Sequence, residues 1–134
     1  MLEITVTSEL ANLAVVNEFV TAYLDGAFCP PKLFMKIGIA VDEIFTNICS
    51  YAYEGAGDVT VRISPLEPAG VMIEFIDGGK PYDPLSAKDP DITLSAEDRK
   101  IGGLGIFIVK KTMDDMTYRR ENGKNVLSVK KYFV

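Results

Sequence analysis

The stretch AVDEIFTN at residues 40–47 decides how this sequence folds, because it combines an apolar helical pattern with two polar side chains. The apolar positions around it recur near the helical period from Leu33 to Ile48. Two prolines at positions 30 and 31 suit the first turn of a helix. We therefore predict one long helix that runs from these prolines to about Tyr53.

Glu43 and Asn47 lie four residues apart in this helix, so they project from the same face on successive turns. A carboxylate at such a place can accept a proton or orient a water molecule. An amide oxygen can complete the octahedral shell of a Mg²⁺ ion that is held mainly by phosphates. A Glu-x-x-x-Asn spacing also occurs on an ordinary solvated helix face, which is the alternative interpretation.

Patterns on either side of this helix predict the rest of the fold. Ser8 is placed to cap a helix that runs to about Leu24, with Leu10 on its apolar stripe, and a further helix begins at Leu104. The predicted fold class is an α/β two-layer sandwich, with helices on one face of a mostly antiparallel, mixed sheet. Alternating apolar residues predict its five strands, at about residues 2–6, 59–63, 71–76, 116–120 and 126–133.

The motif Asp77-Gly78-Gly79 follows directly on the strand predicted at residues 71–76. An aspartate at a strand end can accept a hydrogen bond from the amino group of a purine, and Gly79 would let the backbone approach a flat base. Aspartate and glycine are also the commonest turn residues, so a simple turn is the alternative.

A second glycine-rich motif, Gly102-Gly103-Leu104-Gly105, leads straight into the predicted C-terminal helix. Unpaired N–H groups at a helix start lie at the positive end of the helix dipole and can bind phosphate oxygens. The alternative is that these glycines only permit a tight packing contact. The aperiodic segment 77–105 is longer than an ordinary connection, which indicates a functional or disordered loop.

The composition fits one compact domain over residues 1–134, since 48% of the residues are hydrophobic and 25% are charged. The formal net charge of −5 argues against nucleic acid as a partner, because phosphate backbones are bound by clustered cations. The chain contains no histidine, which excludes histidine metal ligands and a phosphohistidine formed within it.

Cysteine usage and hydropathy point to a reducing, aqueous compartment. Cys29 and Cys49 lack the paired spacing of a zinc or redox motif, and we interpret them as reduced packing residues. The N-terminus lacks the pattern of a secretory signal, and no stretch has the length and apolarity of a membrane span. We therefore expect a cytoplasmic protein with no membrane contact.

The three polar motifs, in this order and at this spacing, resemble the GHKL superfamily of ATP-binding domains, which includes gyrase, MutL, histidine kinases and the anti-sigma serine kinases. The resemblance covers nearly the whole chain and implies the Bergerat-type ATP-binding fold. It implies that Glu43 is a general base and that Asn47 is a Mg²⁺ ligand. It also implies that Asp77 accepts the adenine amino group and that Gly79 forms part of the adenine wall.

The same resemblance assigns the phosphates of ATP to the second glycine-rich motif, at Gly103, Leu104 and Gly105. Residues 82–101 would form a lid over the nucleotide. Candidate charge partners for the γ-phosphate within that lid are Lys88, Arg99 and Lys100, and the alternative is that these cations are merely solvated.

Residues 103–114 narrow the resemblance to the anti-sigma regulatory serine kinases, whose small domains contain a similar segment. This implies a kinase that phosphorylates a STAS-type anti-anti-sigma partner and sequesters a sigma factor. A non-catalytic ATP-binding module that binds a partner protein is the alternative, although the intact Glu43 argues against it. On the first helix, Val15, Phe19 and Tyr23 leave a homodimer or sigma-factor contact open beside burial in the core.

Two positions depart from the pattern of the superfamily. Pro81 stands where a second glycine of the first motif is frequent, which puts the geometry of the adenine-side loop in question. Tyr51 stands where many relatives carry a histidine, one turn after the asparagine. Neither departure touches the proposed pair Glu43 and Asn47.

Overall fold

The structure is a computed structural model that describes residues 1–86 and 103–134. Five strands form one sheet in the order β1-β2-β3-β5-β4, and all four pairings are antiparallel, with no parallel pair among the described residues. The predicted strands are confirmed to within two residues at each end. Their bounds are β1 Leu2–Thr7, β2 Asp58–Pro65, β3 Gly70–Asp77, β4 Asp115–Glu121 and β5 Lys124–Tyr132.

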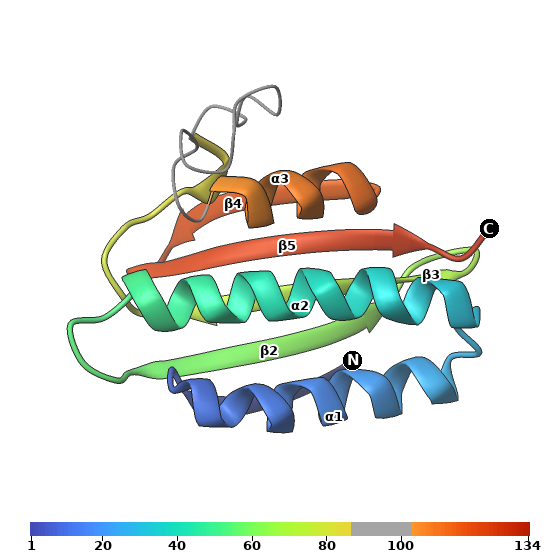
Figure 1. The fold of residues 1–134 in the computed structure, drawn as a ribbon, viewed down its shortest axis with the longest axis horizontal. Coiled ribbons are helices and arrows are strands. Elements are labelled where there is room, and N and C mark those ends of the chain that lie inside the picture. Colours follow the sequence, from blue (N-terminus) through green and yellow to red (C-terminus); the bar gives the residue numbers. More distant parts are fainter. Residues whose placement is uncertain (87–102) are drawn as a thin grey trace.

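Within the described residues, three α-helices cover one face of this sheet (Figure 1). They are α1 Leu13–Gly26, α2 Pro31–Tyr51 and α3 Gly103–Thr112. Two short 3-10 helices, η1 and η2, lie at Leu10–Asn12 and Pro84–Ser86. α2 lies between α1 and α3 (Figure 1), and the predicted α/β two-layer sandwich with helices on one side is confirmed.

The core lies between the two layers because the inward rows of both are apolar. In β2, Val59, Val61 and Ile63 are fully buried and alternate with half-buried polar residues. Burying such a side chain contributes about 1.5–3 kcal/mol relative to leaving it exposed. This stripe holds α2 against the sheet and so fixes the positions of Glu43 and Asn47. The most deeply buried residues of α2 are Ile37, Val41, Ile44 and Phe45.

The start of the first helix differs from the prediction. The sequence pattern predicts Ser8 as its cap and Leu10 as part of its stripe, but α1 begins at Leu13 and Leu10 is 61% exposed. Ser8 is buried, where its N–H donates to the Gly57 carbonyl at 2.8 Å and its Oγ accepts from the Gly57 N–H at 3.0 Å. Both predictions were wrong because this long-range pairing takes the place of the local cap.

The opposite face of the sheet, which no described helix covers, is mostly polar, with Met72, Ile76 and Val126 as its apolar members on β3 and β5. Glu74 of the central strand β3 lies 3.8 Å from Arg62 Nη1 and 3.5 Å from Arg119 Nη2. Each arginine also contacts an outer carboxylate, Arg62 that of Glu3 at 2.8 Å and Arg119 that of Glu121 at 2.6 Å. The buried carboxylate of Glu74 is thus paired with two arginines, as a buried charge requires.

The two cysteines are free, as the sequence predicts. Cys29 is buried and Cys49 is half-buried, and burial raises the pKa of both thiols. A raised pKa keeps a thiol protonated and unreactive, which agrees with a packing role.

The apolar residues on the outer side of α1 divide between core and surface. Phe19 and Tyr23 are partly buried against the core, whereas Val15 is 47% exposed.

Across the described part of the chain, no helix is both long and apolar enough to cross a membrane.

Candidate functional site

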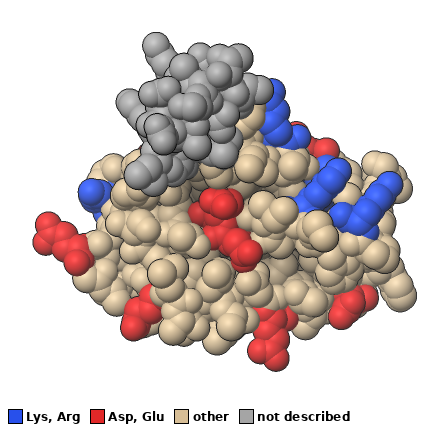
Figure 2. Space-filling view, in the orientation of Figure 1, with Lys and Arg blue, Asp and Glu red and all other residues tan. Residues whose placement is uncertain are grey.

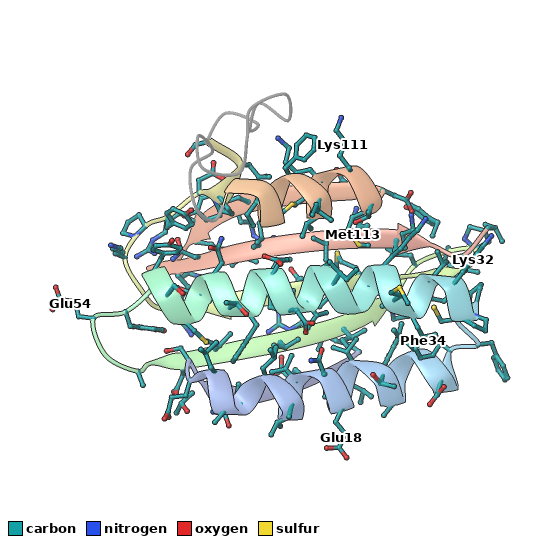
Figure 3. The ribbon with its side chains drawn as sticks, viewed as in Figure 1. Glu18, Lys32, Phe34, Glu54, Lys111 and Met113 are labelled. Carbon is teal, nitrogen blue, oxygen red and sulfur yellow. The ribbon has the colours of Figure 1, made fainter. Side chains whose placement is uncertain are left out.

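A pocket with an empty volume of about 370 Å³, open space at its mouth included, lies beside the last turns of α2. In Figure 3, Lys32 marks the N-terminal end of α2 and Glu54 lies beyond its C-terminal end, so the pocket is toward Glu54. A mainly apolar hollow with a few polar groups is typical of a small-molecule site. Its polar lining comes from Asn47, Asp77 and Asn125, and its apolar lining from Ile44, Ile48, Ala52, Pro84, Leu127 and the rings of Tyr82 and Tyr118.

Asp77 ends β3 and is 5% exposed. Its Oδ1 accepts hydrogen bonds from the Gly79 N–H and from Asn125 Nδ2, each at 2.9 Å. Its Oδ2 accepts no hydrogen bond from the described residues. A buried carboxylate oxygen without a protein donor suits a ligand that brings its own donor, such as the amino group of a purine.

Asn125 of β5 lines the pocket and was not among the site residues predicted from the sequence. The β3–β5 register places it opposite Asp77. Its Nδ2 also donates to the Lys80 carbonyl at 2.8 Å, while its Oδ1 accepts from the Tyr82 N–H at 3.3 Å and from the Tyr118 hydroxyl. One buried amide therefore connects the carboxylate to the loop that follows it.

A weak signal for Asn125 was present in the sequence. It belongs to the inward row of β5, where the following members of that row, Leu127 and Val129, are buried and apolar. A polar residue in an inward apolar row needs hydrogen-bond partners, which here come from another strand.

Gly79 packs against the end of α2. A Cβ added to Gly79 would lie 2.2 Å from the backbone oxygen of Ala52. The Lys80 N–H donates to that same oxygen at 2.9 Å, and Arg120 Nη1 donates to the Gly79 carbonyl at 2.9 Å. These contacts explain why a glycine is needed at this position, while its part in an adenine wall stays a prediction.

Tyr53 ties the two loops at this end of the molecule together. Its hydroxyl accepts from the Gly78 N–H at 2.7 Å and donates to the Asp58 carbonyl at 2.8 Å. Burial raises the pKa of Tyr53, and the charges of Asp77 and Asp58 add to the rise. The neutral phenol is therefore the form that holds the loops.

Glu43 contacts Gly105 where α2 meets α3. A Cβ added to Gly105 would lie 2.0 Å from Glu43 Oε2, so the carboxylate fills the space of the missing side chain. Figure 2 shows acidic side chains over α2, whose two acidic residues are Asp42 and Glu43. Asp42 Oδ1 accepts from Asn17 Nδ2 of α1 at 2.9 Å, so Glu43 is the one that faces α3.

The second glycine-rich motif contains a helix start, because α3 begins at Gly103 with Leu104 in its first turn. The predicted helix start at Leu104 is therefore confirmed to within one residue, and three of the four motif residues belong to the helix itself. Gly102 and residues 87–101 of the predicted lid lie outside the described residues. The candidate phosphate partners in that lid, which also lie outside them, are Lys88, Arg99 and Lys100.

The site residues form two groups connected by one helix. Asn47 and Asp77 line the pocket, and Glu43 meets Gly105 one turn away, about 6 Å along α2 at 1.5 Å per residue. This arrangement fits a nucleoside triphosphate with its base at the buried Asp77 and its phosphates toward the start of α3. Asn47 is the pocket residue one turn from Glu43, and its amide oxygen is of the type that fits a Mg²⁺ ion held mainly by phosphates.

Comparison with known proteins agrees with this geometry. Residues 6–131 match the family model described as the histidine kinase-like ATPase domain. The chain therefore belongs to the histidine kinase-like ATPase family, which confirms the resemblance to the GHKL superfamily.

Curated relatives of the chain are named as protein kinases. Serine/threonine-protein kinase BtrW of Bordetella bronchiseptica is 26% identical over 99 residues, which is 73% of this chain and 70% of that protein. Serine-protein kinase RsbW of Listeria monocytogenes is 32% identical over 98 residues, 69% of this chain and 62% of that protein. RsbW of Bacillus cereus is 32% identical over 97 residues, which is 69% of this chain and 60% of that protein. The chain therefore spans about three fifths of the length of these RsbW proteins.

Proposed function

We propose that this chain binds Mg·ATP and is an anti-sigma regulatory serine-protein kinase, which phosphorylates a STAS-type anti-anti-sigma partner and sequesters a sigma factor. The observation that carries the proposal is the line of groups along α2, with Asn47 and Asp77 at the pocket and Glu43 against Gly105. The names of the relatives support a hydroxyl acceptor, since BtrW is named a serine/threonine-protein kinase and RsbW a serine-protein kinase.

Base binding is assigned to the pocket. Asp77 Oδ2 would accept the hydrogen bond of the exocyclic amino group of adenine, because its Oδ1 is already held by Gly79 and Asn125. The apolar walls would cover the faces of the ring. A carboxylate held in one orientation before the ligand arrives loses little side-chain entropy on binding.

Phosphoryl transfer is assigned to the α3 end of the site. Glu43 would accept the hydroxyl proton of the partner's serine as the serine oxygen bonds to the γ-phosphorus and the bond to the leaving ADP oxygen breaks. Backbone N–H groups at Gly103, Leu104 and Gly105 would face the phosphates at the positive end of α3. When bound, Mg²⁺ would neutralise part of the phosphate charge, with Asn47 as its protein ligand.

The chain would bind protein partners, and neither nucleic acid nor a membrane, in the cytoplasm. The net charge of −5 supports partners other than nucleic acid. A homodimer stays a prediction, as does a lid formed by residues 82–101.

The test is transfer of labelled phosphate from Mg·[γ-³²P]ATP to the STAS-domain proteins encoded in the same genome. We expect label on a serine of one of them, and Glu43→Gln should lower the rate about 10²- to 10⁴-fold while ATP binding persists, because it removes a general base. Asp42→Asn, one residue away but hydrogen-bonded to α1, is the matched control and should keep the activity. If the chain binds ATP but labels no partner, the non-catalytic binding module is the correct account.

A further inference from the structure

Two exposed tyrosines lie together at the edge of the pocket. Tyr82 lines the pocket, and Tyr51 lies in the last turn of α2. Their ring centroids are 5.7 Å apart and their planes are inclined by 30°. Tyr51 is 42% exposed and Tyr82 is 41% exposed, so the pair lies at the mouth and not in the core.

Hydrogen bonds hold the backbone around Tyr82 in place. The Tyr82 N–H donates to Asn125 Oδ1 at 3.3 Å, and the Lys80 carbonyl accepts from Asn125 Nδ2 at 2.8 Å. The Lys80 N–H is held by the Ala52 carbonyl at 2.9 Å, at the end of the same helix that carries Tyr51. The segment therefore brings Tyr82 to a fixed place beside the last turn of α2.

The Tyr82 hydroxyl makes no side-chain hydrogen bond with the described residues, and the Tyr82 ring contacts the ring of Tyr51. Aromatic rings with centroids 4.5–7 Å apart attract each other beyond the apolar area they bury. The Tyr51 ring thus favours the ring orientation in which Tyr82 stands against the pocket. A flat base in the pocket would find an aromatic wall on that side.

We propose that Tyr51 and Tyr82 form an aromatic latch that retains the base of a bound nucleotide. Tyr82 is the residue that contacts the base, and Tyr51 is a positioning residue that acts through the Tyr82 ring. The inference rests on the proposed nucleotide binding and adds to it the group that sets how long the nucleotide stays. It also gives a role to the departure from histidine at position 51.

The test measures Mg·ATP affinity by calorimetry and nucleotide release by stopped flow for the wild type and four variants. Tyr51→Ala and Tyr51→Leu remove the ring, and the leucine variant keeps helix propensity and apolar area. Tyr51→Phe keeps the ring without the hydroxyl. Tyr132→Ala removes a tyrosine of similar exposure, 38%, that does not line the pocket.

We expect both ring-removing variants to release ATP faster and to bind it about three- to tenfold more weakly, which is the range that one aromatic pair supports. Tyr51→Phe and Tyr132→Ala should match the wild type, and thermal unfolding should show that all four variants are folded. Wild-type binding in a folded Tyr51→Leu overturns the latch and leaves the proposed function intact. A Tyr51→Phe variant as weak as Tyr51→Ala also overturns it, while a wild type that binds no ATP overturns both proposals.

Discussion

The two ends of the site along α2 are built in different ways. At the pocket end, Asp77 and Asn125 are both 5% exposed and are held by hydrogen bonds that the β3–β5 pairing brings together. At the α3 end, Glu43 and Gly105 meet through close packing between two helices. The pocket end is thus part of the sheet's own stability, whereas the α3 end depends on how one helix rests on another. Changes at the first end should cost stability and binding together, and changes at the second should cost catalysis first.

The largest expected effect is at Gly79, where the account of the pocket end is easiest to break. Gly79→Ala places a Cβ 2.2 Å from the Ala52 backbone oxygen, which cannot move without moving the end of α2. We expect the free energy of unfolding to fall by about 3 kcal/mol in urea titrations.

Gly78→Ala is the matched control for this change. Its added Cβ would lie 3.5 Å from the Tyr53 hydroxyl, an ordinary contact distance, so the free energy of unfolding should change by less than about 0.5 kcal/mol. Equal tolerance of both substitutions would show that the loop is not packed against α2 as described.

Asn125→Ala should have the next largest effect, because it strips partners from several buried groups at once. The substitution leaves the Tyr82 N–H and the Tyr118 hydroxyl without their acceptor. It also removes one of the two donors to the Asp77 carboxylate. We expect a loss of about 2 kcal/mol in stability together with weaker ATP binding. Tyr118→Phe removes one of these contacts and should cost less; a larger loss for Tyr118→Phe would contradict the central place of Asn125.

Gly105→Ala sharpens the comparison at the α3 end. The added Cβ meets the end of a flexible glutamate side chain and not backbone, so Glu43 can swing aside and stability should fall by only about 1 kcal/mol. Phosphoryl transfer should fall far more than stability, because the carboxylate is displaced.

Gly38→Ala, in the middle of α2, is the control for a glycine inside a helix. No atom lies within 4 Å of its added Cβ, so the change should stabilise the protein by about 0.4–1 kcal/mol and leave transfer unchanged. A Gly105→Ala variant with full activity would argue against the place of Glu43 in the chemistry.

The smallest effect is expected from pH, at Tyr53. Its pKa is raised from the ordinary value of 10.0 mainly by burial, so the folded state holds the phenol proton more tightly than the unfolded state. The stability that this provides is fully present below pH 10.0 and is lost as pH rises through the folded-state pKa. The melting temperature should fall as pH rises above 10.0, and it should fall less in Tyr53→Phe than in the wild type. An equal fall in both proteins would show that Tyr53 is not the cause.

The parts of the fold that follow from local pattern could be predicted from the sequence. Strand alternation and the apolar stripe of α2 gave the layers, since inward rows must be apolar wherever one face is buried. The start of α1 could not be predicted, because Ser8 pairs with Gly57, 49 residues away, and not with the helix beside it.

The candidate site shows the same division. Glu43 and Asn47 share a helix face, so their neighbourhood follows from spacing alone. Asn125 acquires its role only when the strand register sets it opposite Asp77, which no local pattern in the sequence specifies. The contact of Gly79 with Ala52 likewise depends on where α2 ends relative to β3.

Calorimetric titration with Mg·ATP tests the central claim most directly, on the wild type, Asn47→Ala and Glu43→Ala. The account predicts that the wild type binds, that Asn47→Ala loses the Mg²⁺-dependent part of the affinity, and that Glu43→Ala still binds because its role is in transfer. A wild type that binds no ATP would contradict the account, and so would an Asn47→Ala variant whose affinity keeps its full dependence on Mg²⁺.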